Sequence, residues 1–431
     1  MRESIRKRGN PGSWEYILEL GKQLAQRCEA CNKRYWLDRT RLARCPACGG
    51  QLSDVEERRQ VTKGGFATAK EAAEAHSRAK VEVAEHRYVV VSDITVADYL
   101  MNEWLPSVKT TIRPSTHVSY AGHVSNHIIP GIGSLQLQAL TPAAINARYA
   151  YLLENGRGQG RGLSPATVHH VHVTLHRALR DAVRWRRLHH NPADAADPPR
   201  ASAHRKEMEV WTGDELRTFL TSVSGSPLYP LWLLLSTTGM RRGEALGLHW
   251  EDLAVASRKV SIRRSLSMLH GLPVVTEPKT RRGSRTIPLD PATVDALVAH
   301  RRGQYEARML GGDKWTDSLY VFTKPLGDRL DPNYVTLCFK KAVKAAGLRP
   351  IRLHSLRHTY ATLALAAGMN PRDLSARLGH STVAFTLDVY SHAVAALEVE
   401  SADAVAALIV PSLEGPREEP CWQNVGNETP A

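Results

Sequence analysis

The 431-residue chain contains little cysteine and no long apolar run. Six cysteines in a chain of this length are too few for a disulfide framework. No window approaches the roughly 18 consecutive apolar residues that a membrane span requires, and the longest apolar run, at 228–235, predicts a buried helix. Residues 1–10 lack the apolar segment of a signal peptide. We therefore expect a cytoplasmic protein that does not enter a membrane.

Acidic residues are also in deficit. The chain has 57 Lys and Arg against 43 Asp and Glu, which gives a formal net charge of +14. Such an excess predicts a polyanionic partner, either nucleic acid or an anionic membrane surface. The length is sufficient for two to four domains, each with its own core.

Residues 1–92 are expected to form the first domain. Alternating patterns predict strands at 13–20 and 55–63, and an Ala-rich stretch predicts a helix at 67–85. Basic strands followed by a helix could place a small sheet in a DNA groove. The alternative is a generic α+β module with a solvated basic face.

Two CxxC pairs, separated by thirteen residues, lie in an insert at about 26–52 of this domain. Each pair places two thiolates on one tight turn, and Gly49 and Gly50 permit the backbone reversal after the second turn. The pattern predicts one structural zinc ion with four sulfur ligands and no open position for catalysis. Paired disulfides or idle thiols are the alternatives. The predicted ligands are Cys28, Cys31, Cys45 and Cys48.

Residues 94–192 are predicted to be a helical domain. Thr95, Thr141 and Ser164 stand at helix starts, and Pro130 with Gly131 should end the helix that begins near 113. The helix at 164–188 carries His and Arg opposite its apolar face, which favours phosphate contact over a metal site. A Pro-rich linker follows at 193–208.

The remaining residues, 209–410, are predicted to form a mixed domain of helices and a three-stranded meander at 258–290, followed by a disordered tail at 411–431. The fold class is thus a multidomain α+β protein, mainly α with small β-sheets.

Polar residues gather at 351–393. His354 and Arg357 stand three apart on one helical face, His380 follows a helix-ending Gly379, and Tyr390 comes ten residues later. A Tyr, two His and an Arg without a nearby carboxylate pair suit an anionic centre, and a phosphodiester fits best.

Two upstream segments carry further cations. Arg241 lies near a helix start with Glu244 one turn on, which suits an Arg held toward an anion, although a surface salt bridge would give the same spacing. Lys279 lies in a hairpin with several arginines. It could donate a proton to a leaving oxygen, or the turn could simply contact phosphates.

Taken in order, the segments TGMRRGE, PKT, HSLR and LGH and the Tyr390 that follows them resemble the tyrosine recombinase (phage integrase) family over roughly 94–408. The helical domain resembles the core-binding (SAM-like) domain of that family. The first domain is similar to the arm-type DNA-binding domain of lambda-type integrases, from which it departs by its four-cysteine insert.

The resemblance implies a role for each residue. Tyr390 would attack the scissile phosphate and form a 3′-phosphotyrosyl intermediate, while Arg241 and Arg357 hold the non-bridging oxygens. Lys279 would protonate the leaving 5′-oxygen. The three supporting roles would be general acid/base for His354, phosphate hydrogen bonding for His380 and support of the site for Glu244. Neither a nucleotide nor a catalytic metal is implied.

The same resemblance implies the partners. These are double-stranded DNA attachment sites, four protomers on two duplexes exchanging strands through a Holliday junction, and possible host DNA-bending and directionality factors. A helix predicted at 397–410 would pack on a neighbouring protomer or fold back on its own domain. The function expected is integration and excision of a mobile element. The alternatives are a Xer-like resolvase of chromosome or plasmid dimers and a DNA-binding protein that no longer cuts.

Overall fold

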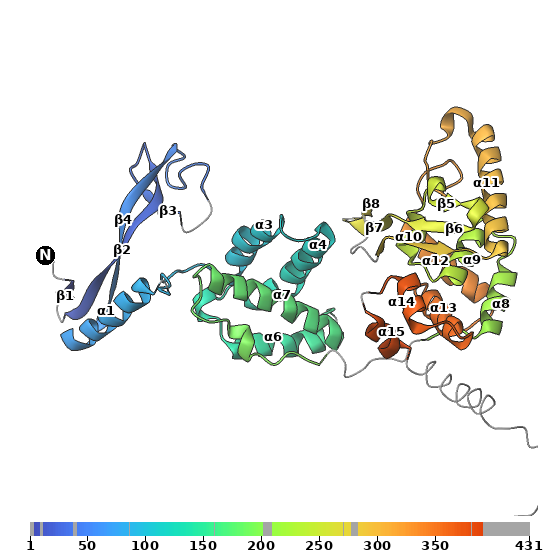
Figure 1. Ribbon diagram of the computed structural model, residues 1–431. Coiled ribbons are helices and arrows are strands. Elements are labelled where there is room, and N and C mark those ends of the chain that lie inside the picture. The colour runs from blue at the N-terminus through green and yellow to red at the C-terminus, as the bar shows by residue number, and fades with distance from the viewer. Residues whose placement is uncertain are drawn as a thin grey trace, which may run out of the picture. The chain divides into compact units, whose positions relative to one another are not determined.

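The structure of the protein is a computed structural model. It describes residues 4–8, 12–37, 41–85, 87–158, 160–200, 209–269, 271–276, 283–380 and 382–390. The chain separates into two compact units, Met1–Lys206 and Glu207–Ala431 (Figure 1). Mixed helices and small antiparallel sheets confirm the predicted fold class. The predicted helix at 397–410 and the tail at 411–431 lie outside the described residues. None of the described helices is long and apolar enough to cross a membrane.

The first unit begins with a four-stranded antiparallel sheet. Its central strand is β2 (Ser13–Cys28), which pairs with β1 (Ile5–Arg8), β3 (Arg34–Trp36) and β4 (Leu52–Phe66). The predicted strands at 13–20 and 55–63 are confirmed, but both extend further, because the β2–β4 ladder continues to the pair Cys28 and Leu52. The first cysteine knuckle therefore begins where this ladder ends.

Helix α1 (Ala69–Ala84) covers this sheet. Thr68 accepts a hydrogen bond from the backbone N–H of Glu71 and so caps the helix start. A small apolar cluster joins the two elements and contains Tyr16, Leu18 and Ala79.

The rest of the first unit is helical, as predicted. The elements are α2 (Val96–Asp98), η1 (Tyr99–Trp104), α3 (Leu105–Val108), α4 (Pro114–His123), η2 (Val124–Ile128), α5 (Ile129–Ile132), η3 (Leu137–Ala139), α6 (Pro142–Asn155), α7 (Pro165–Arg184) and η4 (Pro192–Ala195). Thr95, Thr141 and Ser164 cap helices as expected. Val168, Val171, Leu175 and Leu179 of α7 are buried in one core with Tyr99 and Trp104.

Two details of this region differ from the sequence prediction. Pro130 does not end a helix but lies in the first turn of α5, where its missing N–H costs little, directly after the π-turn η2. On α7, His172 shares a hydrogen bond with Tyr149 and His176 one with Asp194, so these two imidazoles serve the fold.

The second unit carries helices α8 (Gly213–Ser222), α9 (Tyr229–Thr238), α10 (Arg242–Leu246), α11 (Pro291–Gly311), α12 (Pro332–Ala345), α13 (Ser355–Ala366), α14 (Pro371–Leu378) and α15 (Val383–Val389). Short 3-10 turns lie at η5 (Trp250–Asp252), η6 (Val255–Ser257) and η8 (Gly312–Lys314). Thr212 forms a capping box with Glu215, and Asp331 and Asn370 cap α12 and α14.

The strands of this unit form two separate sheets rather than one meander. One contains β5 (Leu253–Ala254), β6 (Lys259–Ile262) and β9 (Arg285–Pro288), and the other contains β7 (Ser265–Leu269) and β8 (Leu272–Thr276). The predicted first strand is interrupted at Arg263 and Arg264, where Arg264 donates hydrogen bonds to Glu251 and Asp252. Because β9 pairs with β6, the predicted order of neighbours was wrong.

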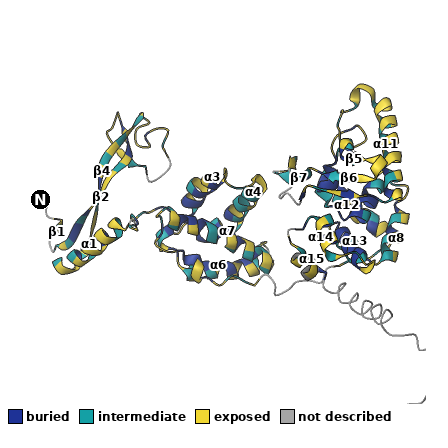
Figure 2. Cartoon of the chain, in the orientation of Figure 1, coloured by how far each residue is buried: buried dark blue, intermediate teal, exposed yellow. Residues whose placement is uncertain are grey.

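Two apolar clusters support the second unit. The larger one centres on Trp211, Phe219, Trp232 and Phe339, and its buried positions follow α9 and α12 (Figure 2). The smaller one joins α13 and α14 to Tyr390 through Ala361, Ala364, Leu365, Leu374 and Leu378. This second cluster holds Tyr390 against α13 and α14.

Candidate active site

Arg357 is held by the ends of two helices. Its side chain leaves the first turn of α13, is buried, and donates Nη1 to the carbonyl of Gly239 at 2.9 Å and Nη2 to that of Leu378 at 2.7 Å. Gly239 follows α9 and Leu378 ends α14, and the carbonyl end of a helix carries partial negative charge that favours a cation. Burial, followed by the nearby charge of Arg241, lowers the pKa of Arg357 to about 9, so the guanidinium remains charged at neutral pH.

Gly239 is suited to this contact by its conformation. Its φ of +65° is left-handed, and an added Cβ would meet Tyr360 Cδ1 at 2.5 Å. A side chain at this position would thus be strained and would also collide with α13. Glycine at this C-cap allows α9 to end with the Gly239 carbonyl facing Arg357.

Arg241 stands at the start of α10 and bonds to Glu244, as the spacing predicted. Its Nη1 lies 2.8 Å from Glu244 Oε1, and its backbone N–H donates to Glu244 Oε2 at 2.9 Å. Its Nη2 lies 3.5 Å from the carbonyl of Gly379. The pair is not a simple surface salt bridge, because the Arg241 side chain is 42% exposed while that of Glu244 is 7% exposed. The guanidinium is therefore anchored on one side and open on the other.

Glu244 also accepts two hydrogen bonds from Arg285, at 3.1 and 2.8 Å. Burial works to raise the pKa of Glu244, but the hydrogen bonds and charges of Arg285 and Arg241 outweigh it and lower the pKa. The carboxylate is thus ionised and neutralises part of the positive charge. Arg285 itself donates Nε to the carbonyl of Arg377 at 2.6 Å and so connects β9 with α14.

The two predicted histidines lie beside these arginines. His354 precedes α13, and His380 follows α14, where its ring nitrogen Nδ1 lies 2.8 Å from Thr386 Oγ1. Desolvation by the surrounding groups lowers the pKa of His354 to about 4, with further contributions from His358, Arg357 and Arg241. Burial lowers the pKa of His380 to about 4, and the positive charges of Arg357 and Arg241 contribute to this shift. Both imidazoles are consequently neutral at physiological pH.

Tyr390 is 3% exposed and packs in the α13–α14 cluster. Its hydroxyl Oη lies 2.8 Å from Nδ1 of His358, a residue of α13. Burial raises the pKa of Tyr390 to about 12, and the charge of Arg357 opposes this effect only in part. The phenol is therefore protonated and needs a proton acceptor before its oxygen can act as a nucleophile.

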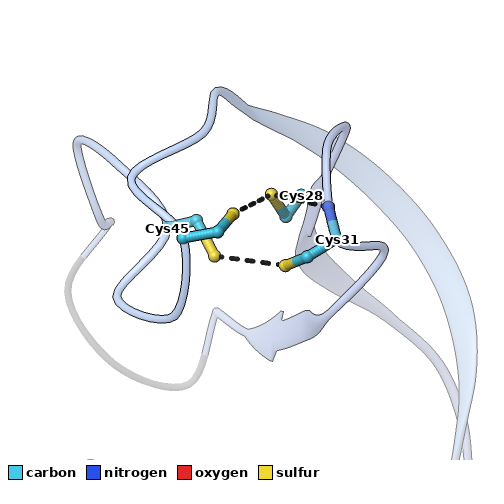
Figure 3. A group of neighbouring side chains, drawn as sticks. Cys28, Cys31 and Cys45 are labelled. Atoms are coloured by element: carbon cyan, nitrogen blue, oxygen red, sulfur yellow. Dashed lines mark hydrogen bonds between the residues drawn. The ribbon is translucent and has the colours of Figure 1, made fainter.

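The four predicted zinc ligands also meet in space. Their sulfur atoms all lie within 4.8 Å of one another, and Figure 3 shows Cys28, Cys31 and Cys45 projecting into one small space. Cys28 Sγ is 3.4 Å from Cys48 Sγ, and Cys31 Sγ is 3.6 Å from Cys45 Sγ. A tetrahedral zinc ion with bonds of about 2.3 Å requires sulfur separations of about 3.8 Å. The cluster therefore fits a four-sulfur zinc site.

The surroundings of this cluster favour the same fit. The backbone N–H of Cys31 lies 3.5 Å from Cys28 Sγ, and the Tyr35 hydroxyl lies 3.3 Å from Cys45 Sγ. A Cβ at Gly50 would come within 3.1 Å of Cys28 Sγ, so glycine keeps the space beside the sulfurs clear. The four thiols are free rather than joined in disulfides.

Comparison with known proteins agrees with this geometry. The sequence model of the phage integrase family matches residues 210–396, and that of the phage integrase N-terminal SAM-like domain matches residues 97–153. Together the two matches span more than half of the chain, and the first of them includes all six predicted catalytic residues. The chain belongs to the phage integrase family of tyrosine recombinases. Its activity is site-specific breakage and rejoining of DNA.

Curated relatives support the assignment over most of the recombinase. The chain is 28% identical over 324 residues to a protein named tyrosine recombinase XerC-like from Caldanaerobacter subterraneus subsp. tengcongensis. The match covers 70% of this chain and 80% of the relative. It is 27% identical over 351 residues to the ICEBs1 integrase of Bacillus subtilis, covering 81% and 92%.

Solved structures show the same fold. The recombinase aligns with the Tn1549 transposon integrase in complex with transposon right end DNA at a TM-score of 0.60 and 21% identity, covering 73% of this chain and 99% of that one. A lambda integrase dimer bound to a core site aligns at a TM-score of 0.50 and 16% identity, covering 90% and 95%.

The structure of the recombinase places Arg241, Glu244, His354, Arg357, His380 and Tyr390 in one region of the second unit. Lys279 lies outside the described residues. Sequence analysis missed His358 and gave Arg285 no separate role. The signal for His358 was present, since it stands four residues after His354 and so shares its helix face.

Proposed function

We propose that this recombinase integrates and excises a mobile genetic element by strand exchange at DNA attachment sites. The observation that carries the proposal is the position of Tyr390, whose hydroxyl lies beside His358 and whose pKa is influenced by the charge of Arg357. A nucleophile next to fixed guanidinium groups suits attack on a phosphodiester, because these groups offset charge that develops on the non-bridging oxygens. Relatives named as integrases favour a mobile element over chromosome or plasmid resolution.

In the proposed reaction Tyr390 forms a 3′-phosphotyrosyl bond and a 5′-hydroxyl leaves. Arg241 and Arg357 bind the non-bridging oxygens, with Arg357 fixed by helix carbonyls and Arg241 by Glu244. His354 serves as a general acid/base, and His380 donates a hydrogen bond to the phosphate. Lys279 protonates the leaving oxygen. The covalent bond to Tyr390 preserves the phosphodiester energy, so rejoining requires neither a nucleotide nor a catalytic metal.

Assembly extends the proposal beyond one chain. Exchange of strands between two duplexes through a Holliday junction needs four active sites, so we propose a homotetramer on DNA. The sheet of β1–β4 with α1 would bind arm-type DNA sites, and Cys28, Cys31, Cys45 and Cys48 would hold a structural zinc ion that fixes the loops beyond β2. Host DNA-bending and directionality factors would act on the same complex.

A nicked DNA half-site tests the chemistry. Cleavage near the nick releases a short fragment and traps the covalent complex, which migrates slowly on a denaturing gel. We expect an adduct with the wild-type chain and none with Tyr390→Phe, which keeps the ring in its apolar cluster. No adduct with either chain, despite DNA binding, would instead support the alternative of a DNA-binding protein that does not cut. An adduct that persists in Tyr390→Phe would refute the assignment of the nucleophile.

A further inference from the structure

The proton on the Tyr390 hydroxyl needs an acceptor, and the imidazole that contacts this hydroxyl is that of His358 rather than that of His354, to which general acid/base work is assigned above. His358 Nδ1 lies 2.8 Å from Tyr390 Oη, within ordinary hydrogen-bond distance, and the two ring centroids are 5.9 Å apart. His358 is on helix α13, whose later residues Ala361, Ala364 and Leu365 belong to the apolar cluster that holds Tyr390. The ring is thus fixed next to the reacting oxygen.

The other histidines have different contacts. His380 directs Nδ1 to Thr386 Oγ1 at 2.8 Å, and the ring of His354 meets the ring of His358 edge-on, with centroids 5.1 Å apart. His354 stands four residues before His358, at the N-cap of α13. The hydrogen bond with the Tyr390 hydroxyl is made by His358.

We propose that His358 is a catalytic residue that orients Tyr390 and accepts its proton during cleavage. A neutral imidazole protonated at Nε2 leaves Nδ1 free to accept the phenol hydrogen. As Oη bonds to phosphorus, its proton moves to His358 Nδ1 and the bond from phosphorus to the 5′-oxygen breaks. The 5′-oxygen receives its proton from the separate general acid. In the reverse reaction the 5′-hydroxyl attacks and His358 returns the proton to Oη.

The charges around His358 suit this cycle. Burial, followed by the charge of Arg357, lowers the pKa of His358, so the ring is neutral and able to accept before DNA arrives. The groups that face it are His354 and Arg357 on its own helix, His380 beyond α14, and Tyr390. When a phosphodiester joins them, its negative charge stabilises the imidazolium and makes proton transfer from a buried phenol more favourable.

This inference rests on the proposed function, and two His358 variants separate its parts. His358→Asn places an amide oxygen near the position of Nδ1 and retains a hydrogen-bond acceptor, but it cannot take up a proton. His358→Ala removes both properties. The matched control is His300→Asn, because His300 is another partly buried imidazole of the second unit, bonded to the carbonyl of Val321 and away from Tyr390. Thermal melting and half-site binding are measured for each variant to verify folding.

The first measurement is the rate of adduct formation on the nicked half-site across pH 5–9. We expect His358→Asn to react about 10²-fold more slowly than wild type, and His358→Ala more slowly still, since general base catalysis contributes about 10²–10⁴-fold. The wild-type rate should rise with pH as His358 loses its proton, and this rise should be missing in His358→Asn. A His358→Asn rate within about threefold of wild type, with the same pH profile, would overturn the proposal.

A second substrate distinguishes activation of the nucleophile from protonation of the leaving group. A 5′-bridging phosphorothiolate has a thiolate leaving group, which departs without a proton. We expect this substrate to restore cleavage by Lys279→Ala but not by His358→Ala. Restoration of His358→Ala would show that His358 acts on the leaving group and would refute its assignment as the base. If the wild-type chain forms no adduct on either substrate, the proposed function fails rather than the role of His358.

Discussion

Arg285 and Glu244 form a two-point ion pair in which each side chain is only 7% exposed. Arg285 is the first residue of β9, and Glu244 belongs to the short helix α10, whose N-cap is Arg241. The pair therefore connects β9 with the helix start that carries Arg241, to which we assign the non-bridging oxygens. All three guanidinium nitrogens of Arg285 donate within the protein, in four hydrogen bonds to Glu244, Gly283 and Arg377, so we assign this arginine a supporting role in the site.

Removal of Arg285 should strongly destabilise the second unit. Arg285→Met leaves Glu244 buried with only one partner, and breaking a buried ion pair costs about 3–5 kcal/mol. The surface pair of Arg217 and Asp214, whose side chains are 78% and 87% exposed, provides the control, and Arg217→Met should cost about 0–1 kcal/mol. Urea unfolding measures both, and equal losses would contradict a structural role for the buried pair.

Substitution of Arg357 by lysine should impair chemistry more than folding. A lysine keeps the charge but cannot span the carbonyls of Gly239 and Leu378 while presenting a planar fork to the phosphate. We expect the adduct rate to fall by about 10²–10³-fold, as for loss of one preorganised charge-stabilising group. Arg308→Lys, in an exposed pair with Asp317, should retain the wild-type rate.

Two glycines provide a matched test of the site backbone. Gly239 and Gly347 have φ values of +65° and +66°, but a Cβ at Gly347 has no atom within 4 Å, whereas one at Gly239 would strike Tyr360 and Leu378. Gly347→Ala should therefore cost only the left-handed strain of about 1 kcal/mol. Gly239→Ala should cost about 1–3 kcal/mol more because of overpacking. Similar free energies of unfolding for the two variants would show that α13 moves enough to accommodate the added methyl group, which would contradict the prediction.

Protonation of His380 should reduce stability in acid. In the unfolded chain this imidazole binds a proton below about pH 6.5, whereas in the folded protein it does so only near pH 4. Acid thus favours the unfolded state, and the contribution of His380 is complete above pH 6.5 and is lost progressively as the pH falls toward 4. The full difference is about 3 kcal/mol for a shift of this size. His380→Asn should show a shallower decline of unfolding free energy from pH 6.5 to 4, and an unchanged decline would contradict the assignment.

Zinc content should depend on the four-cysteine cluster alone. Purified protein is expected to contain one zinc ion per chain by elemental mass spectrometry, and Cys31→Ser should lose it because a closed site needs all four sulfurs. Cys338→Ser is the control, since Cys338 is a free cysteine on α12 outside the cluster. Metal-free wild-type protein, or equal zinc in both variants, would refute the site.

The sequence predicted elements best where a local rule was sufficient. Capping residues such as Thr141 and Ser164 marked helix starts because their side chains satisfy nearby N–H groups, a requirement independent of the rest of the fold. Strand pairing failed because it depends on distant partners. Nothing near Arg285 indicates that β9 pairs with β6 rather than with its hairpin neighbour β8.

The same distinction applies to the site. His354 and Arg357 could be placed on one face from their spacing alone. The contact of His358 with Tyr390 joins residues 32 apart and required the packing of α13 against the segment after α14. The carbonyls that hold Arg357 could not be predicted at all, because every residue has a carbonyl and only the fold selects which ones turn inward.

Those carbonyls have a consequence for how the enzyme can be studied. A peptide oxygen does not titrate in the pH range in which proteins stay folded, and the guanidinium of Arg357, with a pKa of about 9, stays charged below pH 8, so the attachment of Arg357 to Gly239 and Leu378 is indifferent to acid. An arginine held instead by a carboxylate would loosen as that group gained a proton. With this anchor constant, a change of cleavage rate between pH 5 and 8 reports on histidines, and kinetic titration becomes a direct probe of proton transfer.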